Sequence, residues 1–147
     1  MKQDDKSLVK IIIDTNVWIS FLMGKILAGL EYYIYDNHFQ IVSCKEQLSE
    51  LKEVLFRPKM ERYFSIQQVN GIFDLLADYA LLVKILSKID ICRDAKDDYL
   101  LALAIDSKAD FLITGDKDLL AMEQIKTTKI ISFKDFKDIF LAPQKMI

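Results

Sequence analysis

The sequence predicts an α/β protein built on one parallel sheet, and three features of the 147-residue chain favour this class. Short apolar runs rich in β-branched residues alternate with segments of helical periodicity. The runs are hydrophobic at almost every position, which is typical of strands buried on both faces of a parallel sheet. With only 4 glycines and 2 prolines, the chain has little room for long loops. We therefore expect one domain over residues 1–147.

Five segments fit the strand pattern and predict a five-stranded sheet. The first is almost wholly apolar and leads directly into an acidic residue, Asp14. The strands are predicted at residues 8–13, 39–42, 80–85, 111–114 and 129–131. Residues 1–7 form an N-terminal extension before the first strand, and residues 142–147 are expected to form a frayed tail.

The segments between these strands have the apolar spacing of amphipathic helices. The first covers residues 17–35, with a break predicted near Gly24. Ser43, followed by Glu46 three residues later, predicts a capping box at the start of the second helix. Pro58 predicts its end and a short turn over residues 58–64. The remaining helices are predicted at residues 65–79, 94–106 and 132–140.

Composition excludes several classes of protein. Apolar residues make up 52% of the chain and charged residues 29%, which indicates a globular protein. The apolar runs are too short to span a membrane, and the N-terminus lacks the apolar core of a signal peptide. Cys44 and Cys92 are too few and too far apart for a disulfide framework or a zinc site, so we expect a reducing, cytoplasmic location. A net charge of −2 gives no overall attraction to nucleic acid, so such a role depends on local basic patches or bound cations.

Asp14 is the first candidate site residue, because it places a charge at the carboxyl end of the first strand. Thr15 and Asn16 are typical of helix starts, so the next helix should begin here. In open α/β sheets, ligands bind outside the carboxyl ends of the strands. Taken alone, Asp14 fits a simple helix cap better than a site, because acidic caps are common. The rest of the chain favours a site.

The fourth strand repeats this design, because residues 111–113 are followed by Thr114, Gly115 and Asp116. A fifth acid, Asp118, comes just beyond. Parallel strands end at the same edge of a sheet, so we expect Asp14 and Asp116 to lie near one another.

Two helix positions supply further carboxylates. If Asp94 caps its helix, Asp97 falls in the first turn, on the face that carries Leu100 and Leu101. N-terminal enrichment of acids is the alternative explanation for Asp97. On the second helix, Glu50 lies about 110° from the centre of the apolar stripe, whereas Glu46 and Glu53 lie about 150° and 170° away. Of these three glutamates, only Glu50 borders the packed face.

Four carboxylates at one edge of a sheet would repel one another and raise one another's pKa values. Hard divalent cations neutralise such a cluster, and ligand sets made only of oxygen favour Mg²⁺ or Mn²⁺. The chemistry that this arrangement suits best is phosphodiester hydrolysis, in which bound cations activate water and stabilise the charge on the phosphate. The only histidine, His38, falls in a predicted turn and is expected to face solvent. No serine triad or glycine-rich phosphate loop is visible in the sequence.

Four motifs of the chain resemble, in order, the successive motifs of the PIN domain. They are Asp14-Thr15-Asn16-Val17, Glu50-Leu51, residues 97–104 (DDYLLALA) and residues 114–119 (TGDKDL). Each motif alone is weak, but four in the right order are specific, and the match spans residues 9–131. The chain is most similar to bacterial and archaeal PIN proteins related to VapC-type toxins. This resemblance implies a three-layer α/β/α fold with a five-stranded parallel sheet.

The resemblance also implies an activity, partners and site residues. Such proteins are Mg²⁺- or Mn²⁺-dependent ribonucleases, are frequently homodimers, and in many cases are neutralised by a small antitoxin whose tail covers the acidic pocket. The implied catalytic and metal-binding acids are Asp14, Glu50, Asp97 and Asp116, with Asp118 as a variable fifth ligand. Asn16 and Thr114 match the polar residues that orient the first and last acids. The choice of Asp97 over Asp98 rests on alignment to Ala102 and Ala104, and Ala95 stands where related sequences often have proline.

A basic stretch follows Glu50 and has two interpretations. It is either a solvated surface or an edge beside the acidic site that contacts RNA phosphates. Its members are Lys52, Arg57, Lys59 and Arg62.

Other functions remain as alternatives. A phosphatase of the haloacid dehalogenase class also begins with an Asp at a strand end, but it needs a second Asp two residues later as general acid, where this chain has Asn16. A receiver-type phosphoacceptor places its acids and lysine in a different order. The non-enzymatic alternative is an inactive PIN fold that binds RNA or a protein partner.

Overall fold

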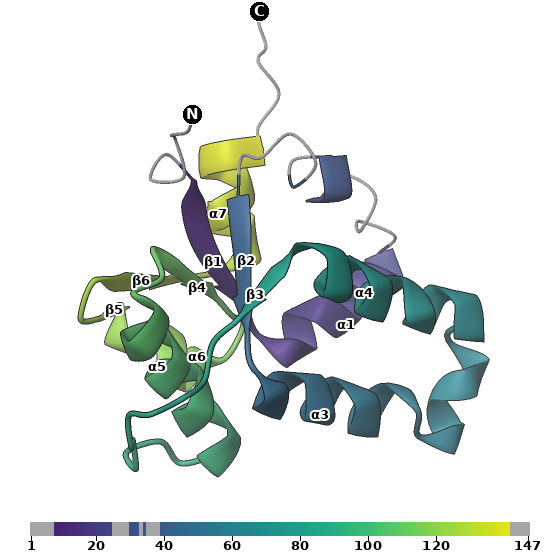
Figure 1. Ribbon diagram of the computed structural model, residues 1–147, viewed down its shortest axis with the longest axis horizontal. Coiled ribbons are helices and arrows are strands. Elements are labelled where there is room, and N and C mark those ends of the chain that lie inside the picture. Colours follow the sequence, from purple (N-terminus) through teal and green to yellow (C-terminus); the bar gives the residue numbers. More distant parts are fainter. Residues whose placement is uncertain (1–7, 25–29, 33, 35–38, 142–147) are drawn as a thin grey trace, which may run out of the picture.

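A computed structural model describes residues 8–24, 30–32, 34 and 39–141 of the chain. Six strands form one sheet in the order β3-β2-β1-β4-β6-β5 (Figure 1). The strands are β1 (Val9–Ile13), β2 (Phe39–Ser43), β3 (Ala80–Leu82), β4 (Phe111–Ile113), β5 (Gln124–Ile125) and β6 (Thr128–Ile131). Five of them run parallel, as predicted, although β3 ends three residues earlier than expected.

The prediction of five strands was wrong by one, because β5 pairs antiparallel with β6 at the edge of the sheet. β5 has only two residues, too few to show an alternating pattern. The hairpin turn also lacks the usual Asn-Gly signal, since Lys126 itself adopts the left-handed conformation with φ of 51°.

Helices cover both faces of the sheet, which confirms the predicted three layers (Figure 1). Alternate residues of β1 face opposite sides: Ile11 and Ile13 belong to one core cluster, whereas Ile12 belongs to the other. The helices are α1 (Thr15–Gly24), α3 (Lys45–Leu55), α4 (Ile66–Tyr79), α5 (Ala95–Ser107), α6 (Lys117–Met122) and α7 (Phe133–Phe136), with a 3₁₀ turn η2 (Pro58–Arg62) and a π-helical turn η3 (Lys137–Leu141).

The two core clusters draw on different helices. The first packs α1, α3, α4 and α7 against one face, with Trp18, Phe21 and Phe136 fully buried. The second packs α5 and α6 against the other face, through Leu101 and Leu119 among others. Because both faces are covered, every residue of the central strand β1 from Ile11 to Ile13 is inaccessible to solvent.

The predicted cap at Asp94 is confirmed, since its side chain accepts a hydrogen bond from the backbone N–H of Lys96. Ser65 and Ser132 likewise accept a backbone hydrogen bond at the start of their helices. The capping box at Ser43 was wrong, because Ser43 is the last residue of β2 and its hydroxyl donates to Oε1 of buried Gln47 at 2.6 Å. Cys44 takes the cap position without a side-chain hydrogen bond. The ladder to β3 holds Ser43 in the strand and leaves its side chain unavailable as a cap.

Several predictions lie outside the described residues. The described part of α1 extends to Gly24, and the predicted break near Gly24 and most of the continuation to residue 35 reach beyond the described residues, as does His38. The N-terminal extension and the C-terminal tail are also outside. No helix among the described residues is long and apolar enough to cross a membrane.

Candidate active site

The order of the strands creates a natural ligand site between β1 and β4. From β1 the chain proceeds to β2 and β3 on one side, and β4, β6 and β5 lie on the other. The connections on the two sides diverge at this point, so the carboxyl ends of β1 and β4 open into a crevice where α/β proteins bind ligands. Asp14 and Thr114 are the residues that immediately follow these two strands.

Asp14 is held rigidly at the end of β1. Its backbone N–H donates to the carbonyl oxygen of Ile113 at 2.9 Å, and its own carbonyl accepts from Val17 and Trp18 at the start of α1. Its side chain is only 7% exposed, and Oδ2 accepts a hydrogen bond of 2.6 Å from the Thr114 hydroxyl. Burial raises the pKa of Asp14, while the hydrogen bonds from Thr114 and from the backbone of Asn16 oppose that rise.

Thr114 connects Asp14 to a second acid. Its side chain is fully buried, and its hydroxyl oxygen accepts from the backbone N–H of Asp116 at 3.1 Å while it donates to Asp14. Asp116 caps α6, because its Oδ1 accepts from the backbone of Asp118 at 2.8 Å and of Leu119 at 3.1 Å. One hydroxyl therefore connects the carboxylate of Asp14 to the backbone of Asp116.

Asp97 is the third member of this group and the one whose protonation is most perturbed. It lies in the first turn of α5, after the N-cap Asp94. Its pKa is raised to about 7, first by burial, then by the negative charges of Asp116, Asp14 and Asp94, and by a side-chain hydrogen bond with Asp116. No lysine or arginine in the described part of the chain forms an ion pair with Asp14, Asp97 or Asp116. We call these three residues the acidic cluster.

Glu50 borders the acidic cluster but has partners of its own. Its Oε1 accepts hydrogen bonds from the hydroxyls of Tyr99 at 2.6 Å and Thr15 at 2.9 Å, and its Oε2 lies 3.9 Å from Nζ of Lys96. The charge of Glu50 contributes to the raised pKa of Asp14, which places the two acids within electrostatic range of each other. Sequence reasoning missed these three partners. The i, i+3 spacing of Lys96 and Tyr99 on α5 was the available signal.

The geometry distinguishes Asp97 from its neighbour Asp98. Oδ1 of Asp98 accepts hydrogen bonds from the backbone N–H groups of Ile91 and Cys92, at 3.2 and 2.9 Å. Hydrogen bonds from Cys92 lower the pKa of Asp98. Asp98 therefore anchors the segment that enters α5, whereas Asp97 belongs to the acidic cluster.

The other predicted site residues lie at the margin or away from it. Asp118 is exposed and forms an ion pair with Arg93, with Nε and Oδ2 3.7 Å apart. Asn16 contributes its backbone N–H to Asp14, and its side chain is exposed. The basic residues Lys52, Arg57, Lys59 and Arg62 are all exposed. Three of them lie at or beside η2, at the end of α3 that is remote from the sheet (Figure 1), so the structure does not bring them to the acidic cluster.

The chemistry of the acidic cluster fits a hard divalent cation. Asp14, Asp97 and Asp116 lie near one another without a neutralising side chain, and the pKa of Asp97 is raised first by burial and then by the negative charges of its neighbours. The side chains are not arranged as a closed coordination shell: no group of three or more His, Cys, Asp or Glu residues among the described ones forms a ready-made metal cage. The ligand type fits Mg²⁺ or Mn²⁺, and the arrangement is an open one.

This three-layer α/β fold, with acids at the carboxyl edge of its parallel sheet, is the architecture that the resemblance to PIN domains implies. The family model of the PIN domain matches residues 10–118, and the chain belongs to the PIN domain family. An uncharacterized protein of Methanocaldococcus jannaschii is 32% identical over 128 residues, an alignment that covers 83% of this chain and 80% of that protein.

Among solved structures, the fold is similar to that of a chain in the crystal structure of VapBC2 from Rickettsia felis, bound to a DNA fragment from its promoter. The TM-score is 0.54 and the sequence identity 13%, and the match covers 83% of this chain and 97% of that one. This likeness shows a shared fold.

Proposed function

We propose that this protein is a Mg²⁺- or Mn²⁺-dependent endoribonuclease that hydrolyses RNA phosphodiester bonds. The observation that carries the proposal is the proximity of Asp97 to Asp14 and Asp116 at the carboxyl edge of the sheet, where the buried hydroxyl of Thr114 bonds both the Asp14 carboxylate and the Asp116 backbone. Membership of the PIN domain family supports the same reaction class.

In this proposal the acidic cluster holds the cation, with Glu50 and Asp118 at its margin. A bound divalent cation would supply a Lewis acid for the phosphate and lower the pKa of the attacking water. Thr114 keeps Asp14 ionised and oriented, since its donated hydrogen bond opposes the effect of burial on the Asp14 pKa. Without a cation the pKa of Asp97 is raised to about 7, and a bound cation would favour the ionised carboxylate that a metal ligand must be.

The experiment is a nuclease assay on single-stranded and structured RNA with Mn²⁺ or Mg²⁺. We expect cleavage that EDTA abolishes, and a loss of at least about a hundredfold in kcat for Asp14→Asn and Asp97→Asn. Asp78→Asn, an exposed acid on α4, is the matched control. Full activity in both cluster variants, or activity in EDTA, would contradict the proposal.

The same assay tests the alternatives. A phosphatase of the haloacid dehalogenase class would hydrolyse p-nitrophenyl phosphate and leave RNA intact. Such an enzyme needs a carboxylic acid at this position as general acid. Asn16 has an amide there, which cannot donate a proton in this way, and its side chain is exposed. An inactive PIN fold would bind RNA or a partner with no cleavage under any metal.

We further propose that the protein is the toxin of a toxin–antitoxin pair and acts as a homodimer. The VapC-like fold supports this role, since the similar solved structure is a VapBC complex. The test is coexpression with the product of an adjacent small reading frame, followed by light scattering of the free and mixed proteins. We expect a dimer alone, and a stable complex that loses ribonuclease activity. A monomer with no inhibitory neighbour would contradict this assignment.

A further inference from the structure

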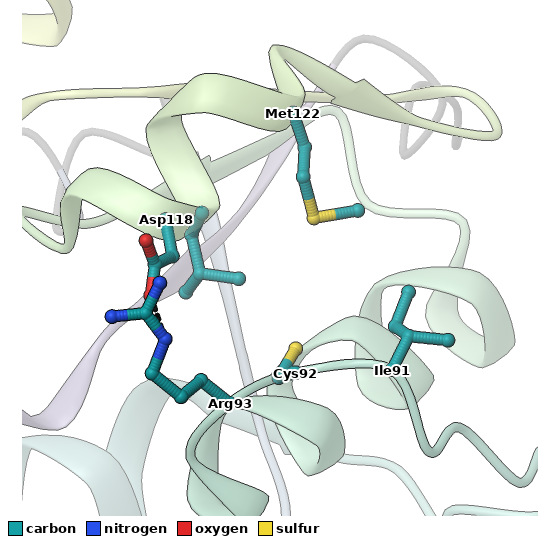
Figure 2. Close-up of a pocket in the computed structure, with 6 residues that line it drawn as sticks. Ile91, Cys92, Arg93, Asp118 and Met122 are labelled. Atoms are coloured by element: carbon teal, nitrogen blue, oxygen red, sulfur yellow. Dashed lines mark ion pairs between the residues drawn. The ribbon is translucent and has the colours of Figure 1, made fainter.

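A cavity of about 450 Å³ lies between the segment that enters α5 and helix α6 (Figure 2). Its walls are largely apolar: Ile91, Leu119 and Met122 line it together with Cys92. Figure 2 shows the Arg93–Asp118 ion pair at one side of this space, with Met122 and Ile91 projecting toward it from opposite sides. The cavity therefore has a charged end and an apolar end.

The charged end adjoins the acidic cluster. Asp118 follows Asp116 by two residues, and the Asp116 side chain accepts its backbone N–H. Arg93 directly precedes Asp94, which caps the helix that carries Asp97. Burial raises the pKa of Cys92 to about 12, and the charges of Asp98, Asp97 and Asp116 add to the rise. A group seated in the cavity would thus be a direct neighbour of a phosphate held at the cluster.

Arg93 is free to serve a ligand. Its side chain is 86% exposed, and an ion pair between exposed groups contributes little to stability. The protein therefore loses little stability when the guanidinium of Arg93 leaves Asp118. Its planar group can stack on a flat ring or form paired hydrogen bonds to a phosphate.

We propose that this cavity is a nucleobase subsite, which holds the base of the RNA nucleotide next to the bond that the acidic cluster cleaves. A nucleobase has two apolar faces and a polar edge, and it leaves a phosphate within reach. Ile91, Leu119 and Met122 would contact the faces, and the polarisable sulfur of Met122 suits an aromatic ring. Arg93 would contact the edge or the adjoining phosphate. Because only an unstacked base can enter, the subsite favours single-stranded RNA. This inference rests on the proposed ribonuclease function.

The first experiment measures base binding directly and needs no catalysis. In protein labelled at its methionine methyl groups, NMR spectra are recorded with millimolar adenosine, guanosine, cytidine or uridine, and with ribose as the sugar control. Ring currents from a bound base should shift the Met122 methyl signal, which Met122→Ala assigns by its disappearance. Met23, exposed on α1, is the internal control, and its methyl signal should not shift. If no nucleoside shifts Met122, or ribose shifts it equally, the subsite is overturned.

The second experiment separates the subsite from the ribonuclease itself. Cut sites in a random RNA pool are sequenced for the wild type, Ile91→Ala, Met122→Ala and Arg93→Ala. We expect the base preference on one side of the cut to relax by about threefold to tenfold, with a similar rise in KM. Leu86→Ala is the matched control, because Leu86 lies in the same extended segment and is as exposed as Ile91.

The outcomes distinguish the two proposals. Cleavage by the wild type with unchanged preferences in all three variants overturns the subsite and leaves the ribonuclease standing. Nucleoside shifts at Met122 without any cleavage support base binding and contradict the proposed reaction. If the cavity instead binds an apolar side chain of a protein partner, no nucleoside will shift the Met122 methyl signal. That result overturns the nucleobase subsite.

Discussion

The hydroxyl of Tyr99 on α5 donates a hydrogen bond of 2.6 Å to Oε1 of Glu50 on α3. This contact joins helices from opposite faces of the sheet across its carboxyl edge. Thr15, at the start of α1, donates to the same oxygen. Burial and the Glu50 carboxylate raise the pKa of Tyr99 far above its ordinary value, so its hydroxyl keeps its proton. Glu50 is therefore positioned by two residues, Tyr99 and Thr15, that lie within the sequence motifs but were assigned no role in the site.

Tyr99→Phe tests whether the position of Glu50 depends on the Tyr99 hydroxyl. The substitution removes one hydrogen bond to a half-buried carboxylate, and we expect a loss of about 1–2 kcal/mol in the free energy of unfolding. Mn²⁺ should also bind more weakly, because Glu50 loses its orientation. Urea denaturation and calorimetric titration measure the two effects. Tyr63→Phe, at an exposed tyrosine, is the control. Unchanged stability and Mn²⁺ affinity in Tyr99→Phe would show that Thr15 and Lys96 are enough to position Glu50.

Asp97 should make stability depend on pH when no divalent cation is bound. Its pKa is about 7 in the folded protein and close to 3.8 when unfolded, so the folded state holds the proton more tightly. The stability gained from this proton is fully present below pH 4 and is lost as pH rises from about 4 to 7. Asp97→Asn removes the charge at similar volume and should therefore be more stable than the wild type at pH 8.

The expected gain is about 1–2 kcal/mol, discounted because Asp97 remains partly exposed to solvent. Thermal unfolding in EDTA at pH 5 and pH 8 measures it, and the gain should be larger at pH 8. Millimolar Mn²⁺ should raise the melting temperature of the wild type more than that of the variant. If Asp97→Asn destabilises at pH 8 and Mn²⁺ shifts both proteins equally, Asp97 is a structural residue only.

Thr114→Val tests the hydroxyl that links Asp14 to Asp116. The side chain is fully buried, so valine fits by shape but leaves Asp14 without its 2.6 Å donor and the Asp116 backbone N–H without its acceptor. We expect a loss of about 1–3 kcal/mol in stability, together with weaker Mn²⁺ binding. Thr114→Ser retains the hydroxyl and should restore the Mn²⁺ affinity even if a small packing defect remains. Equal Mn²⁺ affinity in the Thr114→Val and Thr114→Ser variants would show that the hydroxyl of residue 114 does not support the metal site.

The basic stretch offers a test that depends on RNA length. Arg57, Lys59 and Arg62 lie away from the acidic cluster, so only an RNA long enough to reach η2 can bind them. Replacing the three with glutamine should reduce the salt dependence of binding for long single strands, by a slope of about 0.7 for each phosphate that is no longer neutralised. Binding of very short RNAs should not change. An unchanged slope for long RNA would assign these residues to a solvated surface.

Much of the fold was predictable because its signals are local. The apolar runs of β1, β2, β4 and β6 and the caps Ser65, Asp94 and Ser132 each depend on a few adjacent residues. The two failures have different reasons. Ser43 has the composition of a helix cap, but pairing with the distant strand β3 keeps it in β2. The strand β5 is a local hairpin partner of β6, but its two residues are too few to show an alternating pattern.

The order of residues along the chain already places acids at the ends of two strands and in the first turn of α5. How these acids act depends on contacts that form only in the folded protein. The tertiary structure placed Asp97 with Asp14 and Asp116 and turned Asp98 toward the backbone of Cys92, although the two neighbours are the same residue type. It also gave Glu50 the hydroxyls of Tyr99 and Thr15 as partners. The physical reason is that burial, hydrogen bonding and the pKa of a carboxylate depend on neighbours as many as 100 residues away, as between Thr114 and Asp14.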